Sequence, residues 1–147
     1  MINTGLMSSI SSEWETPNEL FKELDDEFHF TLDVCANQEN WKCWHHFTME
    51  EDGLAMAWMN QMAWMNPPYG REIGKWVAKA YEEVQRWPLT EVVGLLPART
   101  DTKWFHDYIY GKAETRFIKG RIKFVGGKSA APFPSMIVIW RKSNAPH

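Results

Sequence analysis

The stretch Asn66-Pro67-Pro68-Tyr69-Gly70 constrains the fold of this chain more than any other part of the sequence. It follows a short apolar run over 62–65 and precedes an amphipathic segment that opens near Ile73. Proline has no N–H to donate to a strand ladder, and it pushes the residue before it into extended geometry. The strand predicted over 62–65 therefore ends abruptly in a stretched turn, which leads into a helix.

This turn also carries groups suited to an aromatic amino group, such as N6 of adenine. That nitrogen is a poor nucleophile because its lone pair is delocalised into the ring. The side-chain oxygen of Asn66 and the main-chain carbonyl of Pro67 can accept its two N–H bonds, and Tyr69 can stack on the base. Catalysis would then rest on positioning and electrostatics. The alternative is a plain strand-to-helix turn with a surface tyrosine, since short motifs also match by chance.

Length and composition predict one domain with a sizeable core, because the chain has 147 residues and 44% of them are hydrophobic. We expect a flexible arm over 1–12, the domain over 13–141 and a tail over 142–147. The net charge of −3 gives no global basic footprint for nucleic acid. The sequence shows neither a signal peptide nor a membrane-length apolar run, so we expect a cytoplasmic protein away from the membrane. Cys35 and Cys43 lack metal-ligand spacing, which predicts reduced thiols and no metal site.

The N-terminal part predicts a helix that follows a capping box. Thr16 and Glu19 have the spacing of that box, with Pro17 at the first helical position. Leu20, Phe21, Leu24 and Phe28 fall on one face of the helix.

Two acidic residues are candidates for binding a ligand. Asp33 lies near the end of a strand predicted over 30–36, where ligands bind in open α/β sheets. It can bind a ribose or an ammonium group, or it can simply cap the next turn. Asp52 precedes Gly53 in a predicted turn into a short element ending near Trp58, and it can reach an adenine amino group or act as a plain turn residue. His45 and His46 are adjacent, so they point different ways and are expected at the surface or against a base.

The remaining pattern alternates helices with strands, which indicates an α/β fold with a mostly parallel sheet and helices on both faces. The last strands are close in sequence and can pair only as an antiparallel hairpin at one edge. The expected elements are a helix from Ile73 to a stop at Pro88, a strand over 91–97, a helix capped by Asp101 and closed by Gly111, strands over 116–119 and 121–125 joined at Gly120, and a strand over 135–140.

Four stretches, taken in order, resemble the S-adenosylmethionine (SAM)-dependent N6-adenine DNA methyltransferases, most closely the small phage- and prophage-encoded Dam-type family. The likeness runs from about Glu13 to Trp140. It implies a Rossmann-like methyltransferase fold, SAM as cofactor and DNA adenine as substrate, in a bacterial host cytoplasm. The stretches are Trp14-x-Thr16-Pro17, Leu32-Asp33-x-Cys35-Ala36, Asn66-Pro67-Pro68-Tyr69-Gly70 and Leu95-Leu96-Pro97-Ala98-Arg99.

The resemblance also implies roles for single residues, in the numbering of this chain. The catalytic set that would hold the target adenine is Asn66, Pro67, Pro68 and Tyr69, and Phe124, or less favourably Phe117, would pack against the flipped base. The SAM-binding set is Asp33, Cys35 and Ala36 at the first strand, Trp14, Thr16 and Pro17 around the amino-acid end, and Asp52 with Leu54 near the cofactor's adenine.

The chain departs from larger family members in two respects. Asn37-Gln38-Glu39-Asn40 stands where they have a glycine-rich turn, and no separate target-recognition domain is present. We therefore expect a short or relaxed recognition sequence, and a monomer or weak dimer. Positions that can contact phosphates, or can be ordinary surface charges, are Arg71, Lys75, Arg99, Lys103, Arg121, Lys123 and Lys128.

Two other functions remain open at this point. The same motif chemistry serves methylation of RNA adenine or of a protein glutamine. A domain that binds nucleic acid without turnover is the non-enzymatic alternative.

Overall fold

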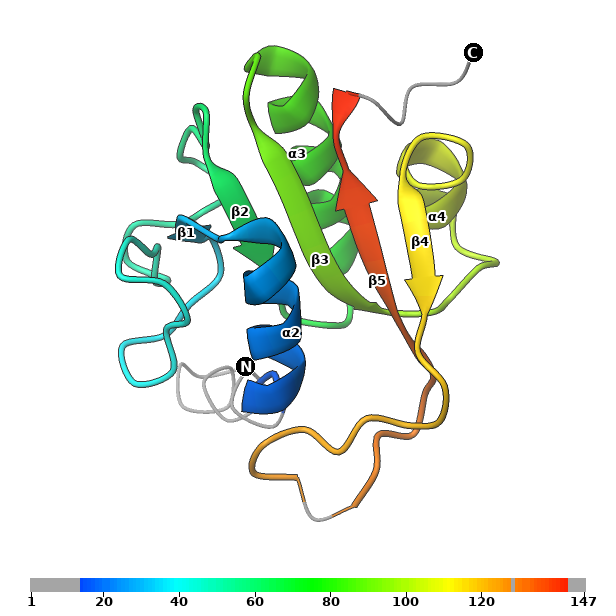
Figure 1. The fold of residues 1–147 in the computed structure, drawn as a ribbon. Helices are drawn as coiled ribbons and strands as arrows, with labels where there is room; N and C mark the ends of the chain where they lie inside the picture. Colours follow the sequence, from blue (N-terminus) through cyan, green and yellow to red (C-terminus); the bar gives the residue numbers. More distant parts are fainter. Residues whose placement is uncertain (1–13, 128, 143–147) are drawn as a thin grey trace.

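A computed structural model describes residues 14–127 and 129–142 and shows an open sheet flanked by helices (Figure 1). The predicted arm over 1–12 and all of the predicted tail except Lys142 lie outside the described residues. The five strands have the order β1-β2-β3-β5-β4. The elements are α2 (Asn18–Phe28), β1 (Leu32–Asp33), β2 (Met62–Met65), α3 (Ile73–Arg86), β3 (Glu91–Pro97), α4 (Lys103–Tyr108), β4 (Glu114–Phe117) and β5 (Ser135–Trp140).

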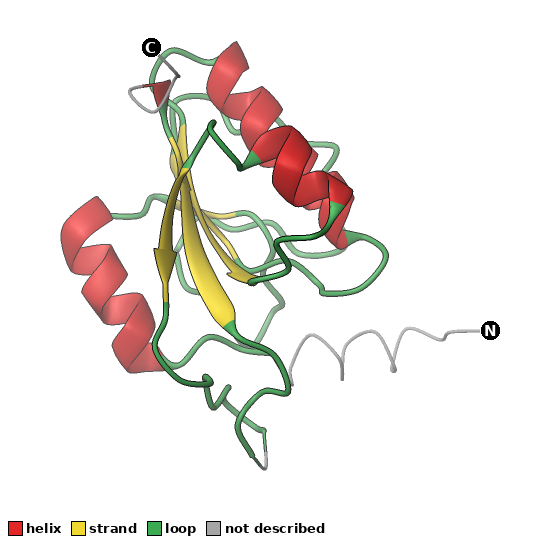
Figure 2. Ribbon diagram, turned by 90° about the vertical axis from the view of Figure 1, so that its right-hand side faces the viewer, coloured by secondary structure: helices red, strands yellow, loops and turns green. Residues whose placement is uncertain are grey.

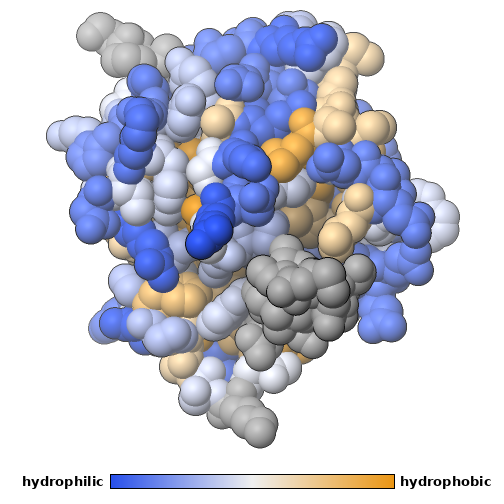
Figure 3. Space-filling model, turned by 180° about the vertical axis from the view of Figure 1, so that it is seen from behind, coloured by the Kyte–Doolittle hydropathy of each residue, from blue (hydrophilic) through white to orange (hydrophobic). Residues whose placement is uncertain are grey.

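Helices cover both faces of the sheet, as the sequence predicts (Figure 2). Successive strand residues point to opposite faces, so the sheet contributes to two separate apolar clusters. One cluster joins Leu24 and Phe28 of α2 to Trp64 and Ile139. The other joins the buried stripe of α3 and residues of α4 to the opposite side of the sheet. The visible surface on the α3 side is mostly hydrophilic, with scattered apolar side chains (Figure 3).

The sheet is mixed, so the prediction of a mostly parallel sheet is not confirmed. The pairs β1–β2 and β2–β3 are parallel, whereas β3–β5 and β4–β5 are antiparallel. The cause is the position of β5, which is inserted between β3 and β4 and runs opposite to both. The predicted antiparallel pairing of the last strands at one edge is confirmed for β4 and β5.

The strand predicted over 121–125 is wrong. Gly120 has a φ of 78° and turns the chain, and beyond it the backbone does not continue a ladder. Ile122 and Phe124 face inward into the α2-side cluster. The backbone of Val125 pairs instead with Glu15 in an isolated antiparallel bridge. In agreement, residues 118–127 and the start of α2 lie at the same end of the molecule (Figure 1).

Both predicted helix caps are also wrong. Pro17, not Thr16, is the cap position of α2, and no side chain caps that helix. At α4 the cap is Thr102 rather than Asp101, and its hydroxyl accepts a hydrogen bond from the N–H of Phe105.

Two irregular regions replace predicted elements near the start of the sheet. The first strand is limited to β1, because the main chain of Asp33 bonds to His45 and Phe47 of the following loop. The segment after Asp52 forms turns rather than a strand or helix. None of the helices in the described part of the chain is long and apolar enough to cross a membrane.

Candidate active site

A cleft of about 390 Å³ lies where β1 and β2 end. This volume is within the range of small-molecule sites. Its walls come from segments far apart in the sequence, which the sheet brings together. They are formed by Trp14, Glu15, Thr16, Asp33, Val34, Cys35, Ala36, Asn37, Asn40, Lys42, Phe47, Thr48, Met49, Asp52, Gly53, Leu54, Asn66, Pro67, Pro68, Glu72 and Trp76.

Asn66 follows β2 directly, and two hydrogen bonds fix its side chain. Its amide nitrogen donates to the main-chain oxygen of Trp14 at 2.7 Å and to the hydroxyl oxygen of Thr16 at 3.1 Å. A main-chain carbonyl can only accept, so the amide must present its nitrogen to Trp14. The side-chain oxygen of Asn66 is buried and finds no donor among residues 14–127 and 129–142. A residue of the cleft wall therefore carries a buried acceptor without a partner in the described part of the chain.

Tyr69 lies beside the cleft, in an aromatic cluster. Its hydroxyl donates to the carbonyl of Leu95 at 3.0 Å. Its ring stacks on Trp14, with centroids 6.1 Å apart and planes at 22°, and meets Phe124 and Phe133 edge-on. Burial raises the pKa of the Tyr69 phenol, so the side chain stays neutral.

The carboxylate of Asp33 is buried at the end of β1. The residue is 3% exposed, and its two oxygens accept from the main-chain N–H groups of Cys35 at 3.2 Å and Lys42 at 2.9 Å. Burial disfavours the charged form and raises the pKa of Asp33 to about 6, although the two N–H groups work in the opposite direction. Asp33 thus holds the following turn and also lines the cleft.

The other residues predicted to bind the cofactor divide into two groups. Cys35, Ala36, Leu54 and Trp14 line the cleft, whereas Pro17 does not. Burial raises the pKa of the Cys35 thiol, which is therefore neutral.

Asp52 is exposed at the cleft with a left-handed φ of 59°, and its carboxylate accepts from the N–H of Leu54 at 3.1 Å. This hydrogen bond corresponds to the second of the two predicted roles of Asp52, that of a turn residue. A β-carbon on Gly53 would lie 2.2 Å from the carbonyl oxygen of Val34, so only glycine lets this turn approach β1.

Several cleft residues escaped the sequence analysis because they lie in a region without periodicity. The loop after Asp33 folds back over the end of β1 and contributes Lys42, Phe47 and Met49 to the walls. Within this loop His46 stacks on Trp41 and its Nδ1 contacts the carbonyl oxygens of Cys43 and Trp44. His46 is thus engaged with its own loop.

The sequence over residues 3–147 matches the family model of the DNA N-6-adenine-methyltransferases (Dam). The chain belongs to this family. A DNA N-6-adenine-methyltransferase of Haemophilus phage HP1 (strain HP1c1) is 29% identical over 148 residues, which cover 95% of this chain and 84% of the phage protein. YfdM of Escherichia coli (strain K12), whose name describes it provisionally as a methyltransferase, is 30% identical over 70 residues, covering 43% of this chain and 77% of that protein.

These matches confirm the resemblance to the Dam family and identify the chain as an adenine-N6-specific DNA methyltransferase. For this Dam-family chain, two phenylalanines were predicted as partners of the target base. Phe124, which was predicted to pack against the base, is 2% exposed and contacts Trp14 edge-on at 5.3 Å. The less favoured Phe117 is 66% exposed on β4.

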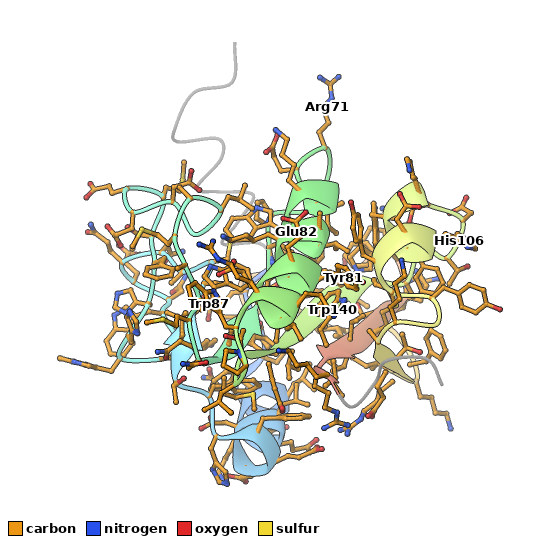
Figure 4. The ribbon with its side chains drawn as sticks, turned by 90° about the horizontal axis from the view of Figure 1, so that it is seen from above. Arg71, Tyr81, Glu82, Trp87, His106 and Trp140 are labelled. Atoms are coloured by element: carbon orange, nitrogen blue, oxygen red, sulfur yellow. The ribbon has the colours of Figure 1, made fainter. Side chains whose placement is uncertain are left out.

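The predicted phosphate contacts divide by their surroundings. Lys75 is paired with Glu72, which directly precedes α3, and Lys103 is paired with Asp107 within α4. The other described members of the predicted set are exposed and have no carboxylate within ion-pair distance in the described part of the chain. Arg71 points away from the protein at the start of α3 (Figure 4). Lys128 lies outside the described residues. The exposed cations without such a partner include Arg71, Arg99, Arg121 and Lys123.

Two of these cations, Arg121 and Lys123, lie in a part of the Dam-family sequence that has no acidic residue. Beyond Glu114 the chain has no Asp or Glu, so every acidic residue lies before the end of β4. Such asymmetry within a chain suggests contact with nucleic acid or a membrane surface, or a basic tail. The basic residues of this part are Arg116, Lys119, Arg121, Lys123, Lys128, Arg141 and Lys142.

Proposed function

We propose that this Dam-family chain uses SAM as the methyl donor and that the cleft at the ends of β1 and β2 binds it. The volume of about 390 Å³ and the mixed apolar and polar walls fit a ligand of this kind. The polar groups of the wall also fit SAM, because the buried carboxylate of Asp33 can accept hydrogen bonds from hydroxyl or ammonium groups of the ligand. The residues that would hold SAM are Trp14, Thr16, Asp33, Cys35, Ala36, Asp52 and Leu54, with Pro17 shaping the segment that carries Thr16.

SAM supplies a methyl group that is already activated by its sulfonium. The chain's task is then to orient the adenine amino group and make its lone pair available. The buried, unpartnered oxygen of Asn66 is the observation that supports this role most directly. Accepting one N–H there, and a second at the Pro67 carbonyl, concentrates electron density on the amino nitrogen. Leaving such an oxygen unsatisfied costs on the order of 1–3 kcal/mol, which an incoming N–H offsets.

The target adenine must leave the duplex, or come from a single strand, to reach this oxygen. We propose that the aromatic cluster of Tyr69, Trp14 and Phe124 receives the base next to Asn66. The rings are already in mutual contact. Admitting a base between them requires Trp14 or Phe124 to move.

The segment that carries Phe124 also provides the proposed contact with the DNA backbone. Arg121 and Lys123 alternate with buried Ile122 and Phe124, so the cations face outward while the apolar side chains anchor the segment. Arg99 in the loop after β3 is a further candidate. These contacts carry no sequence information, and we infer a short or relaxed recognition sequence.

The strand arrangement supports the proposed SAM-dependent methyltransferase version of an α/β fold. β1, β2 and β3 are parallel, and the carboxyl ends of β1 and β2 lead into the cleft. The reversed β5 connects β3 to the edge strand β4. A DNA substrate also implies action in the cytoplasm of a bacterial host, in line with the phage relative.

The deciding experiment measures N6-methyladenine by mass spectrometry in plasmid DNA from a host that lacks its own adenine methylases. Wild type and Asn66→Ala are expressed at equal levels, and RNA and protein from the same cells are assayed in parallel. We expect the modified base in DNA from the wild type alone. Methylation confined to RNA or protein would contradict the proposal. Mapping of the methylated sites would then test specificity, and a long strict motif would rule out relaxed recognition.

A further inference from the structure

The hydroxyl of Thr16 is used in an unexpected way. A threonine just before a helix ordinarily accepts from a main-chain N–H of the first turn, and this cap contributes about 1 kcal/mol. Here no side chain caps α2, and the Thr16 hydroxyl instead accepts from the amide nitrogen of Asn66 at 3.1 Å. The residue is 1% exposed, so the hydroxyl has been buried away from both water and its own helix.

The neighbouring main-chain oxygen of Trp14 takes the second hydrogen of the same nitrogen, at 2.7 Å. Two acceptors therefore hold the nitrogen end of the Asn66 amide. An asparagine amide can rotate by a half turn and exchange its oxygen for its nitrogen. In the exchanged orientation, the cleft would present N–H groups to an incoming amine, and two donors cannot bond to each other.

We propose that Thr16 and the main-chain carbonyl of Trp14 are positioning groups that keep the Asn66 oxygen turned toward the target amine. The inference rests on the proposed function, because it names the groups that prepare the proposed amine acceptor. Neither the Thr16 hydroxyl nor the Trp14 carbonyl contacts the target amine itself. Their effect is to make the productive orientation of the amide the stable one before DNA binds.

The segment that carries both acceptors is itself held from two sides. The main-chain oxygen of Glu15 accepts from the N–H of Val125 at 3.0 Å, and the Glu15 carboxylate lies 3.9 Å from the ammonium of Lys42. The Trp14 ring stacks on Tyr69. Residues 14–16 thus connect the Asn66 motif to the basic segment 121–125.

Two matched pairs of residues at position 16 test the proposal. Thr16 and Thr16→Val have nearly the same shape and differ in the hydroxyl, and Thr16→Ser and Thr16→Ala form a smaller pair with the same difference. For each protein, the turnover number at saturating SAM and DNA, the Kd for SAM by calorimetry and the melting temperature are measured. If Thr16→Val does not fold, the comparison of Thr16→Ser with Thr16→Ala tests the role of the hydroxyl instead.

We expect the turnover number to fall about tenfold in the two variants without a hydroxyl and to be largely kept in Thr16→Ser, because one anchoring hydrogen bond is lost. The Kd for SAM is measured in each protein because Thr16 also lines the cleft, and the turnover number at saturating SAM does not depend on that Kd. A wild-type turnover number for Thr16→Val, or a loss confined to SAM affinity, would overturn the positioning role while leaving the proposed function intact. Absence of DNA methylation by the wild type would instead overturn the proposed function itself.

A measurement independent of activity uses the side-chain amide of Asn66 in an NMR spectrum of nitrogen-labelled protein. Two anchored N–H groups should exchange slowly with solvent in the wild type. Exchange should accelerate in Thr16→Val and remain slow in Thr16→Ser. Equal exchange rates in all three proteins would contradict the inference.

Discussion

The amide nitrogen of Asn66 lies 3.1 Å from the hydroxyl oxygen of Thr16, although the two residues are separated by 50 positions in the sequence. The contact ties the segment before α2 to the turn after β2, and it leaves the Asn66 oxygen buried without a donor in the described part of the chain. The free-energy cost of burying that oxygen without a partner and the missing side-chain cap of α2 both arise at this Asn66–Thr16 contact. Such local conflicts with stability are expected where a site serves a reaction.

Substitution of Asn66 by alanine should separate catalysis from cofactor binding. The side-chain oxygen contacts the target amine in the proposed mechanism, so Asn66→Ala should lower the turnover number by on the order of 100-fold or more. The Kd for SAM should change by no more than about threefold. Methyl transfer from labelled SAM and calorimetry give the two quantities. Gln85→Ala is the control, because Gln85 carries the same amide group, is exposed on α3 and lies outside the cleft. Equal losses of SAM binding and turnover in Asn66→Ala would refute the assignment.

The binding of SAM should depend on pH through Asp33. Its pKa is raised to about 6 by burial, so only about a tenth of the carboxyl groups are charged at pH 5. We expect the affinity for SAM to be about tenfold weaker at pH 5 than at pH 7, because the charged form binds the ligand better. Calorimetry from pH 5 to pH 7.5 measures the effect. Asp33→Asn cannot ionise and should bind weakly with a flat pH profile; a wild-type profile that is equally flat contradicts the role of Asp33.

The same raised pKa has the opposite effect on the stability of the ligand-free protein. The folded state retains a proton on Asp33 at pH values where the unfolded chain has lost it, so the unfolding free energy should decrease as pH rises from about 4 to 6. Above that window Asp33 contributes no further change. Urea unfolding of wild type and Asp33→Asn across these pH values isolates the contribution, since other groups titrate in both proteins. A wild-type curve parallel to that of Asp33→Asn would show that burial does not raise this pKa.

The elements that the sequence predicted well are those with strong periodicity or strong breakers. The bounds of β3 and β5 match the predicted ranges 91–97 and 135–140, because both strands are continuous apolar runs. The helix from Ile73 ends at Arg86, one residue before the main chain extends toward Pro88. Four motifs in order also led to the family that the comparisons confirm.

The sequence could not reveal contacts that depend on tertiary structure. The spacing of Thr16 and Glu19 indicates a helix cap, and only the fold brings Asn66 close enough to take the hydroxyl away. The alternation over 121–125 resembles a strand, but the fold pairs Val125 with Glu15 and buries Ile122 and Phe124 in the α2-side cluster. The segment therefore packs its apolar side chains without joining the sheet. The loop 37–51 has no period, so its contribution to the cleft appears only in three dimensions.

The outward-facing cations of segment 121–125 should govern the salt dependence of DNA binding. Each phosphate contact adds about 0.9 to the slope of log K against log salt. Arg121→Gln and Lys123→Gln should each weaken binding to any duplex and lower the slope by about 1. Fluorescence anisotropy at several salt concentrations measures both. Lys22→Gln is the charge-matched control, because Lys22 pairs with Asp26 on α2 at 3.0 Å; equal slopes in all variants would place the DNA elsewhere.

The turn at Gly53 should tolerate no side chain. A β-carbon there would lie 2.2 Å from the Val34 carbonyl oxygen and 2.9 Å from the Trp76 ring. The first neighbour is main chain and cannot rotate away, so Gly53→Ala should lower the unfolding free energy by about 1–3 kcal/mol. It should also weaken SAM binding, because both neighbours line the cleft. Urea unfolding and calorimetry measure the two effects.

Gly74→Ala provides the comparison that separates this close approach from the general effect of replacing glycine. Gly74 lies near the start of α3, and a β-carbon there would meet its nearest neighbour, the Trp104 side chain, at 3.7 Å. This is ordinary contact, and alanine favours a helix over glycine by up to about 1 kcal/mol. Gly74→Ala should therefore be neutral or stabilising and should leave the Kd for SAM unchanged. If both substitutions destabilised the protein equally, the approach of the turn to β1 would not explain the result at Gly53.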